Sequence, residues 1–115
     1  MTVKRLHKGS RMSQIVIYNR TIYLAGQVGT GSTVGEQTAD MLAKVDRLLK
    51  EAGASKSDIL SAMIWLSDMA NFAEMNLVWD NWIDSDNPPA RACGEARLAT
   101  AEHLVEVVIV AAKPD

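Results

Sequence analysis

The N-terminal third of the chain carries short β-branched and aromatic runs separated by turn residues. Residues 14–18 and 21–26 are two such runs, separated by two residues beginning with Asn19, and we expect residues 3–7 to form a further short strand. This spacing predicts a tight hairpin, and asparagine tolerates the positive φ that such a turn needs. We interpret the glycine-rich stretch at residues 26–32 as a turn whose backbone can approach a ligand or a neighbouring subunit.

Helical spacing begins after this stretch. Over residues 33–52 apolar side chains recur at offsets of three and four, which predicts a helix with one apolar side, and Gly53 can end it. A mostly apolar run at residues 59–66 has the length of a buried strand. From Asn71 the spacing is helical again, until two consecutive prolines at residues 88 and 89 forbid continuation.

The C-terminal third predicts two more strands, at residues 90–98 and 104–112. They follow one another along the chain, and we expect them to form an antiparallel pair. The complete order is β-β-β-α-β-α-β-β, without linkers or internal repeats. It predicts a single α+β domain over residues 1–115.

The last predicted strand is apolar on both faces. Because successive side chains of a strand point to opposite faces, Val107 and Ile109 face one way, and Val108 and Val110 face the other. Two helices can cover about one face of such a sheet, which leaves an apolar face too large for a monomer to expose. We therefore expect identical chains to bury the other face.

The composition fits one globular domain and argues against several classes of function. The chain has 115 residues, of which 48% are hydrophobic and 23% are charged. A formal net charge of -2 argues against a broad surface for nucleic acid or anionic lipid. No window approaches the roughly 18 apolar residues that span a bilayer. We expect a cytoplasmic protein with no nucleic-acid or membrane partner.

Cysteine and histidine are scarce. Cys93 is the single cysteine, so it cannot form an intrachain disulfide, which fits a reducing compartment. The two histidines, His7 and His103, do not have the spacing of zinc ligands relative to Cys93 or to each other. The sequence therefore predicts no metal site.

Two charged residues are the first candidates for chemistry. Glu106 is the lone carboxylate of an apolar run, so a partner or a water-filled pocket lies beside it, unless it is an edge residue with its carboxylate in solvent. Arg91 follows the two prolines, and its planar guanidinium suits bidentate binding of a small carboxylate; the alternative is an ordinary surface arginine. Because we expect their strands to be consecutive and antiparallel, we expect the two side chains to be neighbours. They would then either bind one ligand together or form a salt bridge with each other.

Other positions carry weaker signals. Cys93 shares a strand face with Arg91, but no histidine is placed to activate it, so its backbone matters more than its sulfur. Asn76 is a mediocre helix former inside a helix, and is either solvated or in contact with a ligand. Trp79 and Trp82 are more typical of a core or an interface than of a stacking platform.

Three blocks of the sequence are similar to one known family. The blocks are residues 22–28 (IYLAGQV), residues 72–76 (FAEMN), and residues 89–93 (PARAC) followed by residues 105–107 (VEV). In this order they resemble the YjgF/YER057c/UK114 family, also called the RidA family of reactive-intermediate deaminases, nearly from end to end. The resemblance implies a chorismate-mutase-like α+β fold, with two helices on one face of a mixed sheet. It also implies a homotrimer with a site in each cleft between subunits.

The resemblance further implies a reaction and roles for single residues. Members hydrolyse 2-imino and 2-enamino acids, such as 2-aminoacrylate and 2-iminobutyrate, to 2-oxo acids and ammonia, without a metal or organic cofactor. Arg91 would hold the substrate carboxylate, and Glu106 would position or activate the attacking water. Gly26 would line the pocket through its backbone, Cys93 would contribute its main chain, and Asn76 matches a polar position near the ligand.

Three positions depart from the family pattern. Met12 stands where many members have an aromatic residue in the ligand loop, which bears on pocket shape and substrate preference. Ala25 replaces a hydroxyl residue, and Val108 replaces a second glutamate. A different function for the same trimer is regulation by binding a small 2-oxo acid without catalysis. RNA cleavage, also ascribed to the family, is disfavoured by the net charge.

Overall fold

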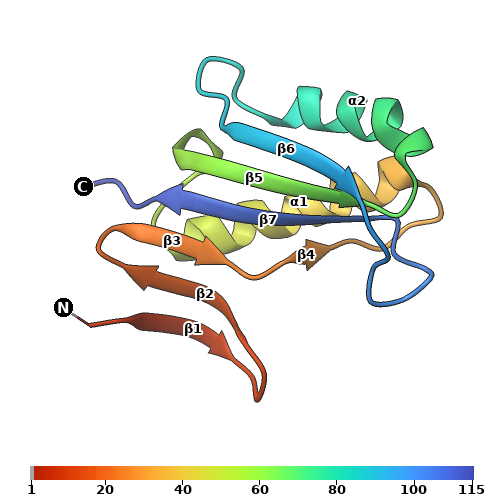
Figure 1. The fold of residues 1–115 in the computed structure, drawn as a ribbon. Helices are drawn as coiled ribbons and strands as arrows, with labels where there is room; N and C mark the ends of the chain where they lie inside the picture. Colours follow the sequence, from red (N-terminus) through yellow and green to blue (C-terminus); the bar gives the residue numbers. More distant parts are fainter. Residues whose placement is uncertain (1) are drawn as a thin grey trace.

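Two helices cover one face of a mixed β-sheet in the computed structural model, which describes residues 2–115 (Figure 1). The helices are α1 (Val34–Glu51) and α2 (Phe72–Trp82). The strands are β1 (Lys4–Lys8), β2 (Ser13–Tyr18), β3 (Thr21–Leu24), β4 (Gln27–Val28), β5 (Ile59–Leu66), β6 (Ala90–Glu95) and β7 (Val105–Ala112). Short 3-10 turns, η1 (Lys56–Asp58) and η2 (Met69–Asn71), precede β5 and α2. Within residues 2–115, neither helix is long and apolar enough to cross a membrane.

The strand order is β1-β2-β3-β7-β5-β6, and β4 pairs with β7 beyond the end of β3. β5 and β6 are parallel, and the other pairs are antiparallel. The expected antiparallel pairing of the last two strands is therefore wrong, because β5 lies between β6 and β7. The physical reason is the connection through α2, since a strand, a helix and a strand in sequence form a unit whose two strands are parallel. The strand expected at residues 21–26 ends at Leu24, and β4 follows it as a separate short strand at residues 27–28.

Local sequence signals set several element ends as expected. β5 covers residues 59–66, as the apolar run predicts. The hairpin between β2 and β3 turns at Asn19 and Arg20, whose φ angles are 52° and 67°. The hydroxyl of Thr33 caps the N-terminus of α1, and Gly53, with φ 87°, follows its C-terminus.

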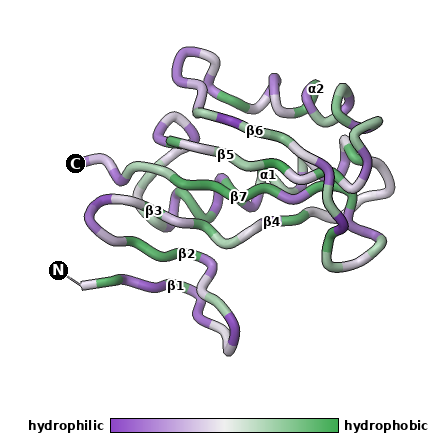
Figure 2. Tube along the Cα trace, in the orientation of Figure 1, coloured by the Kyte–Doolittle hydropathy of each residue, from purple (hydrophilic) through white to green (hydrophobic). Residues whose placement is uncertain are grey.

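Both faces of the sheet are apolar, and the helices cover only one of them. Figure 2 shows the apolar colour running along β5 and β7. The face beneath α1 and α2 contains the core, where alternate residues of β7 are buried: Val105, Val107, Ile109 and Ala111. The opposite face, which we call the open face, carries the other residues of β7 and two tyrosines that are 40% and 48% exposed, Tyr18 and Tyr23. The helix-covered arrangement predicted from the sequence is confirmed.

Candidate functional site

Glu106 lies on the open face, directly against the backbone of Gly26. It pairs across the sheet with Trp65 of β5 on one side and with Val28 of β4 on the other. A Cβ atom added to Gly26 would lie 2.5 Å from Oε2 of Glu106, so a residue without a side chain is needed for this approach. The carboxylate is half-buried and has no hydrogen bond or ion pair within residues 2–115. It is therefore available to a water molecule or a ligand.

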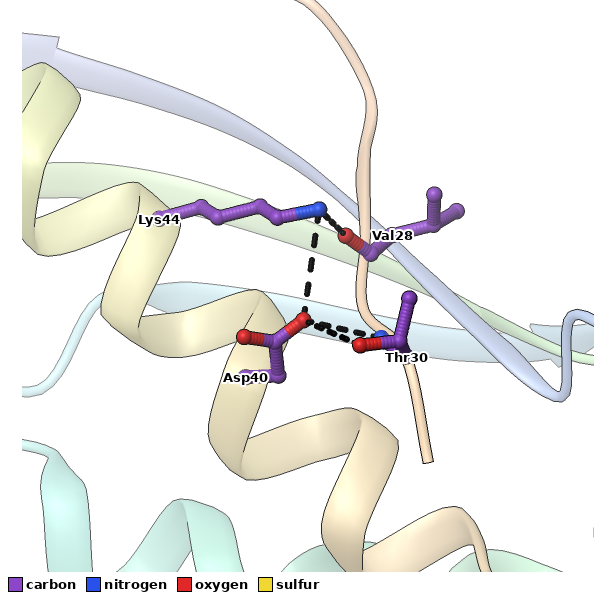
Figure 3. A network of polar contacts seen from close by, with 4 residues as sticks. All are labelled: Val28, Thr30, Asp40 and Lys44. Carbon is purple, nitrogen blue, oxygen red and sulfur yellow. Dashed lines mark hydrogen bonds and ion pairs between the residues drawn. The ribbon is translucent and has the colours of Figure 1, made fainter. Parts of the chain in front are cut away.

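The loop that carries Gly26 is fastened to α1 by a polar network (Figure 3). Lys44 donates to the carbonyl of Val28 over 2.8 Å, and Asp40 Oδ2 accepts from the backbone N–H of Thr30 over 2.8 Å. The Thr30 amide is the main reason why the pKa of Asp40 is lowered from its ordinary value, and the Lys44 charge acts in the same direction. The network fixes β4 and the residues after it against α1, and β4 itself pairs with β7, where Val28 lies opposite Glu106.

Arg91 lies on β6, the outer strand at the opposite edge of the sheet. It pairs with Ala62, whose side chain belongs to the face beneath the helices. The guanidinium carbon lies 5.2 Å from the centre of the Trp79 ring and 6.0 Å from that of Phe72, both on α2. Such cation–π contacts orient the guanidinium, while its N–H groups have no ion-pair partner within residues 2–115. Arg91 is exposed.

Cys93 and Asn76 lie on the same side of the sheet as Arg91. Cys93 is half-buried and packs against the core. Burial raises the pKa of its thiol, although the charge of Arg91 opposes the shift, so the thiol stays protonated at neutral pH. Asn76 lies between Phe72 and Trp79 at helical spacing, on the side of α2 that faces Arg91. Its Oδ1 is buried without a hydrogen-bond partner.

The candidate residues therefore form two separate groups. The glutamate half-site consists of Gly26 and Glu106, and the arginine half-site consists of Arg91, Cys93 and Asn76. The expectation that Arg91 and Glu106 are neighbours is wrong. β5 separates their strands. Trp65 of β5 pairs with Glu106 on one side and with Gly94 on the other, so Glu106 and Gly94 share one face of the sheet. Arg91 lies three residues before Gly94, so its side chain points to the opposite face.

Comparison with known proteins decides the family. The family model described as Endoribonuclease L-PSP matches residues 2–113. The chain belongs to this family, whose solved members include YjgF proteins. Its resemblance to the YjgF family is thereby confirmed.

Relatives match the YjgF-family chain over almost their full length. A RutC family protein of Haemophilus influenzae is 42% identical over 114 residues, which cover 96% of this chain and 98% of the relative. The RutC family protein YoaB of Escherichia coli is 40% identical over 113 residues, with coverage of 97% and 99%. A crystal structure of a YjgF family member from Neisseria meningitidis has a TM-score of 0.99 at 47% identity, covering 100% of this chain and 98% of that one.

Sequence reasoning missed the aromatic support of the arginine half-site. Phe72 and Trp79 lie seven residues apart on α2, but only the parallel pairing of β6 with β5 brings Arg91 over their rings. The i and i+7 spacing of two aromatic residues was the available signal. Met12, one of the three departures from the YjgF pattern, lies in the turn between β1 and β2 with 54% of its surface exposed.

Proposed function

We propose that this YjgF-family protein hydrolyses reactive 2-imino and 2-enamino acids to 2-oxo acids and ammonia, in clefts between the subunits of a cytoplasmic homotrimer. The observation that carries the proposal is the division of the candidate residues into two half-sites on opposite faces of the sheet. Each half-site offers one charged group without an internal partner. A second chain that supplies the arginine half-site to the glutamate half-site completes a site with both charges.

The open face supports assembly of this kind. Half-buried apolar residues of β5 and β7 form its centre, and two exposed tyrosines extend it across β2 and β3: Met63, Trp65, Val108, Val110, Tyr18 and Tyr23. An apolar face of this extent is typical of an interface between protein chains. Burial of this face against neighbouring chains brings Glu106, which lies on it, to the boundary between subunits.

The proposed chemistry needs an anion-binding group, a carboxylate and a water molecule. Arg91 binds the substrate carboxylate through two parallel N–H donors, and its stacking on Trp79 holds the guanidinium plane in place. Glu106 accepts a proton of the attacking water, whose oxygen bonds to the imine carbon; the nitrogen receives protons and leaves as ammonia. The carbon becomes the carbonyl of the 2-oxo acid. The iminium carbon is already electrophilic, so orientation supplies much of the rate.

The remaining residues shape the pocket. Gly26 allows the backbone to lie against the carboxylate of Glu106, and the main chain of Cys93 lines the arginine half-site. The buried Oδ1 of Asn76 can accept an N–H of the substrate. The exposed side chain of Met12, flexible and apolar, would set the size of the substrate side chain that is accepted. No metal or organic cofactor takes part in these steps.

The alternative function is a trimer that binds a small 2-oxo acid and regulates without catalysis. The two functions differ in what they require of Glu106. We expect the wild-type protein to accelerate ammonia release from imines that an amino-acid oxidase generates in situ, and Glu106→Gln to lower kcat/KM about 10²-fold while still binding 2-oxobutyrate. A wild-type protein that never exceeds the rate in buffer, but binds 2-oxobutyrate in calorimetry, would instead establish the regulatory function.

Gly26→Ala tests the contact between the two members of the glutamate half-site. The new methyl group would lie 2.5 Å from Oε2 of Glu106, so the flexible carboxylate must move. We expect kcat/KM to fall about tenfold or more, because small displacements of a catalytic group are costly. The midpoint of urea unfolding should hardly change, since only the end of a side chain is displaced. Gly9→Ala is the control, because a methyl group there meets nothing closer than 3.6 Å.

The description of the family model names an endoribonuclease, but the charge of this chain does not favour RNA as a substrate. Proteins that bind nucleic acid present a basic surface, whereas this chain has a formal net charge of -2. Binding to single-stranded RNA with a steep dependence on salt would be needed to support that activity.

A further inference from the structure

We propose that a pocket at the far end of β6 from Arg91 binds a small phosphorylated metabolite. The pocket lies where the loop between β6 and β7 meets the end of β5, and it has a volume of about 310 Å³. It is lined by Ser67, Arg97, Leu98, Thr100, Ala101 and His103. None of these residues belongs to either half-site, so the proposal does not depend on the proposed deaminase activity.

The polar side chains of this pocket can all donate hydrogen bonds. Arg97 provides a guanidinium fork, Ser67 and Thr100 provide hydroxyls, and His103 provides a ring N–H. None of these four side chains has a hydrogen bond or an ion pair to another group within residues 2–115. Four unpaired donors around one cavity, with no carboxylate in its lining, are suited to an oxyanion. Arginine binds phosphate oxygens in bidentate fashion, which favours phosphate as that oxyanion.

The carboxylates near the pocket do not line the cavity, and within residues 2–115 none of them forms an ion pair with Arg97. Asp68 follows Ser67, but its Oδ1 accepts from the backbone N–H of Ala70. Glu95 accepts from the backbone N–H of Met69. Glu102 is exposed and does not line the cavity. Arg97 therefore gives the lining a positive charge, although the chain as a whole is acidic.

The loop is held in shape by internal hydrogen bonds before any ligand binds. The side chain of Gln37 on α1, which is 3% exposed, donates to the carbonyl of Glu102 over 2.9 Å and accepts from the N–H of Leu104 over 2.8 Å. The backbone of Ser67 also donates to Leu104, over 3.1 Å. A loop fixed in this way pays little ordering entropy on binding, so its donors are preorganised.

The size of the pocket indicates more than a free ion. Pockets for small molecules usually measure roughly 300–1,000 Å³, and the cavity here is at the lower end of that range. Leu98 and Ala101 supply apolar contacts beside the donors. A phosphomonoester with a short carbon chain satisfies both parts of the lining, with the phosphoryl group on Arg97 and the carbon chain on Leu98.

The test is a titration of the intact protein, followed by the backbone amide signals in NMR. The probes are inorganic phosphate and glycerol 3-phosphate, at ionic strength held constant with sodium chloride. We expect saturable shifts at Ser67 and at residues 97–103, with tighter binding of glycerol 3-phosphate than of inorganic phosphate. Arg97→Ala should weaken both about 10-fold or more, since hydrogen bonds to charged groups contribute about 1.5–3 kcal/mol.

Two further variants make the result specific. Thr100→Val keeps the shape of the side chain and removes one donor, so it should weaken binding without altering the fold. Arg47→Ala removes the same charge from an exposed position on α1 and should leave binding unchanged. Absence of saturable shifts in the wild type would overturn the proposal. Equal weakening by Arg47→Ala and Arg97→Ala would also overturn it, because general charge attraction would then explain the shifts. If inorganic phosphate and glycerol 3-phosphate bound with equal affinity, the carbon chain would contribute nothing to binding. The pocket would then be a site for inorganic phosphate, and the proposal of a metabolite ligand would be refuted.

Discussion

Arg91→Ala is expected to lower kcat/KM for ammonia release about 10³-fold, because loss of one partner from a buried, hydrogen-bonded charge pair costs about 2–5 kcal/mol. The substrate carboxylate would lose its bidentate partner and its orientation relative to Glu106. The proposed trimer should remain intact in light scattering, since Arg91 does not lie on the open face that neighbouring chains are proposed to bury. The measurement is ammonia release from imines generated in situ, with the variant and the wild type at equal trimer concentration.

Arg91→Lys is the matched variant for this prediction. Lysine keeps the positive charge but lacks the planar fork and the stacking on Trp79, so we expect an activity between those of the wild type and Arg91→Ala. Arg97→Ala removes an arginine from the same strand-to-loop region, outside the half-sites, and should retain activity. Full activity of Arg91→Ala would contradict the assignment of the carboxylate-binding role to this residue.

Val108→Asp is expected to convert the proposed trimer into monomers and to abolish the proposed activity with it. Val108 lies on the open face and pairs with Met63, near the centre of the surface that neighbouring chains are proposed to bury. An uncompensated charge in a buried interface costs about 3–5 kcal/mol for each chain. The side chain is only half-buried in the single chain, so its fold should survive, with unchanged far-ultraviolet circular dichroism. Light scattering after gel filtration measures the mass.

Ala39→Asp provides the control, because it adds the same charge to an exposed position on α1, on the other side of the molecule from the open face. This variant should remain trimeric and active. If Val108→Asp stayed trimeric, the open face would not be the assembly interface. If it became monomeric yet kept full activity, the proposed site between subunits would be wrong, whereas the oligomer would stand.

The elements of this protein follow from local patterns that are independent of the tertiary structure. The spacing of apolar residues predicts α1 because a helix must bury one side, and the continuous run at residues 59–66 predicts β5 because a covered strand is apolar. Asn19 and Gly53 mark a turn and a helix end because they tolerate positive φ. These signals depend on neighbours a few positions away.

Strand pairing depends on the path of the chain between elements, which periodicity does not report. Residues 96–104 are too long for a tight hairpin, and α2 returns the chain so that β6 adds to the far side of β5. The rule for strand, helix and strand units predicts that β6 is parallel to β5. Arg91 and Glu106 are separated because β5 pairs with β6 on one side and with β7 on the other.

By itself, the sequence of this small domain determined which residue types are available for chemistry and that both sheet faces are apolar. The sequence shows a guanidinium after two prolines, a carboxylate in an apolar run and a glycine before a short strand. Only the tertiary structure decided that these groups belong to two half-sites on opposite faces of the sheet. The register of β5 with its two neighbours points Arg91 and Glu106 to opposite faces. Glu106 and Gly94 both pair with Trp65, and Arg91 lies three residues before Gly94, an odd separation that reverses the side-chain direction along a strand.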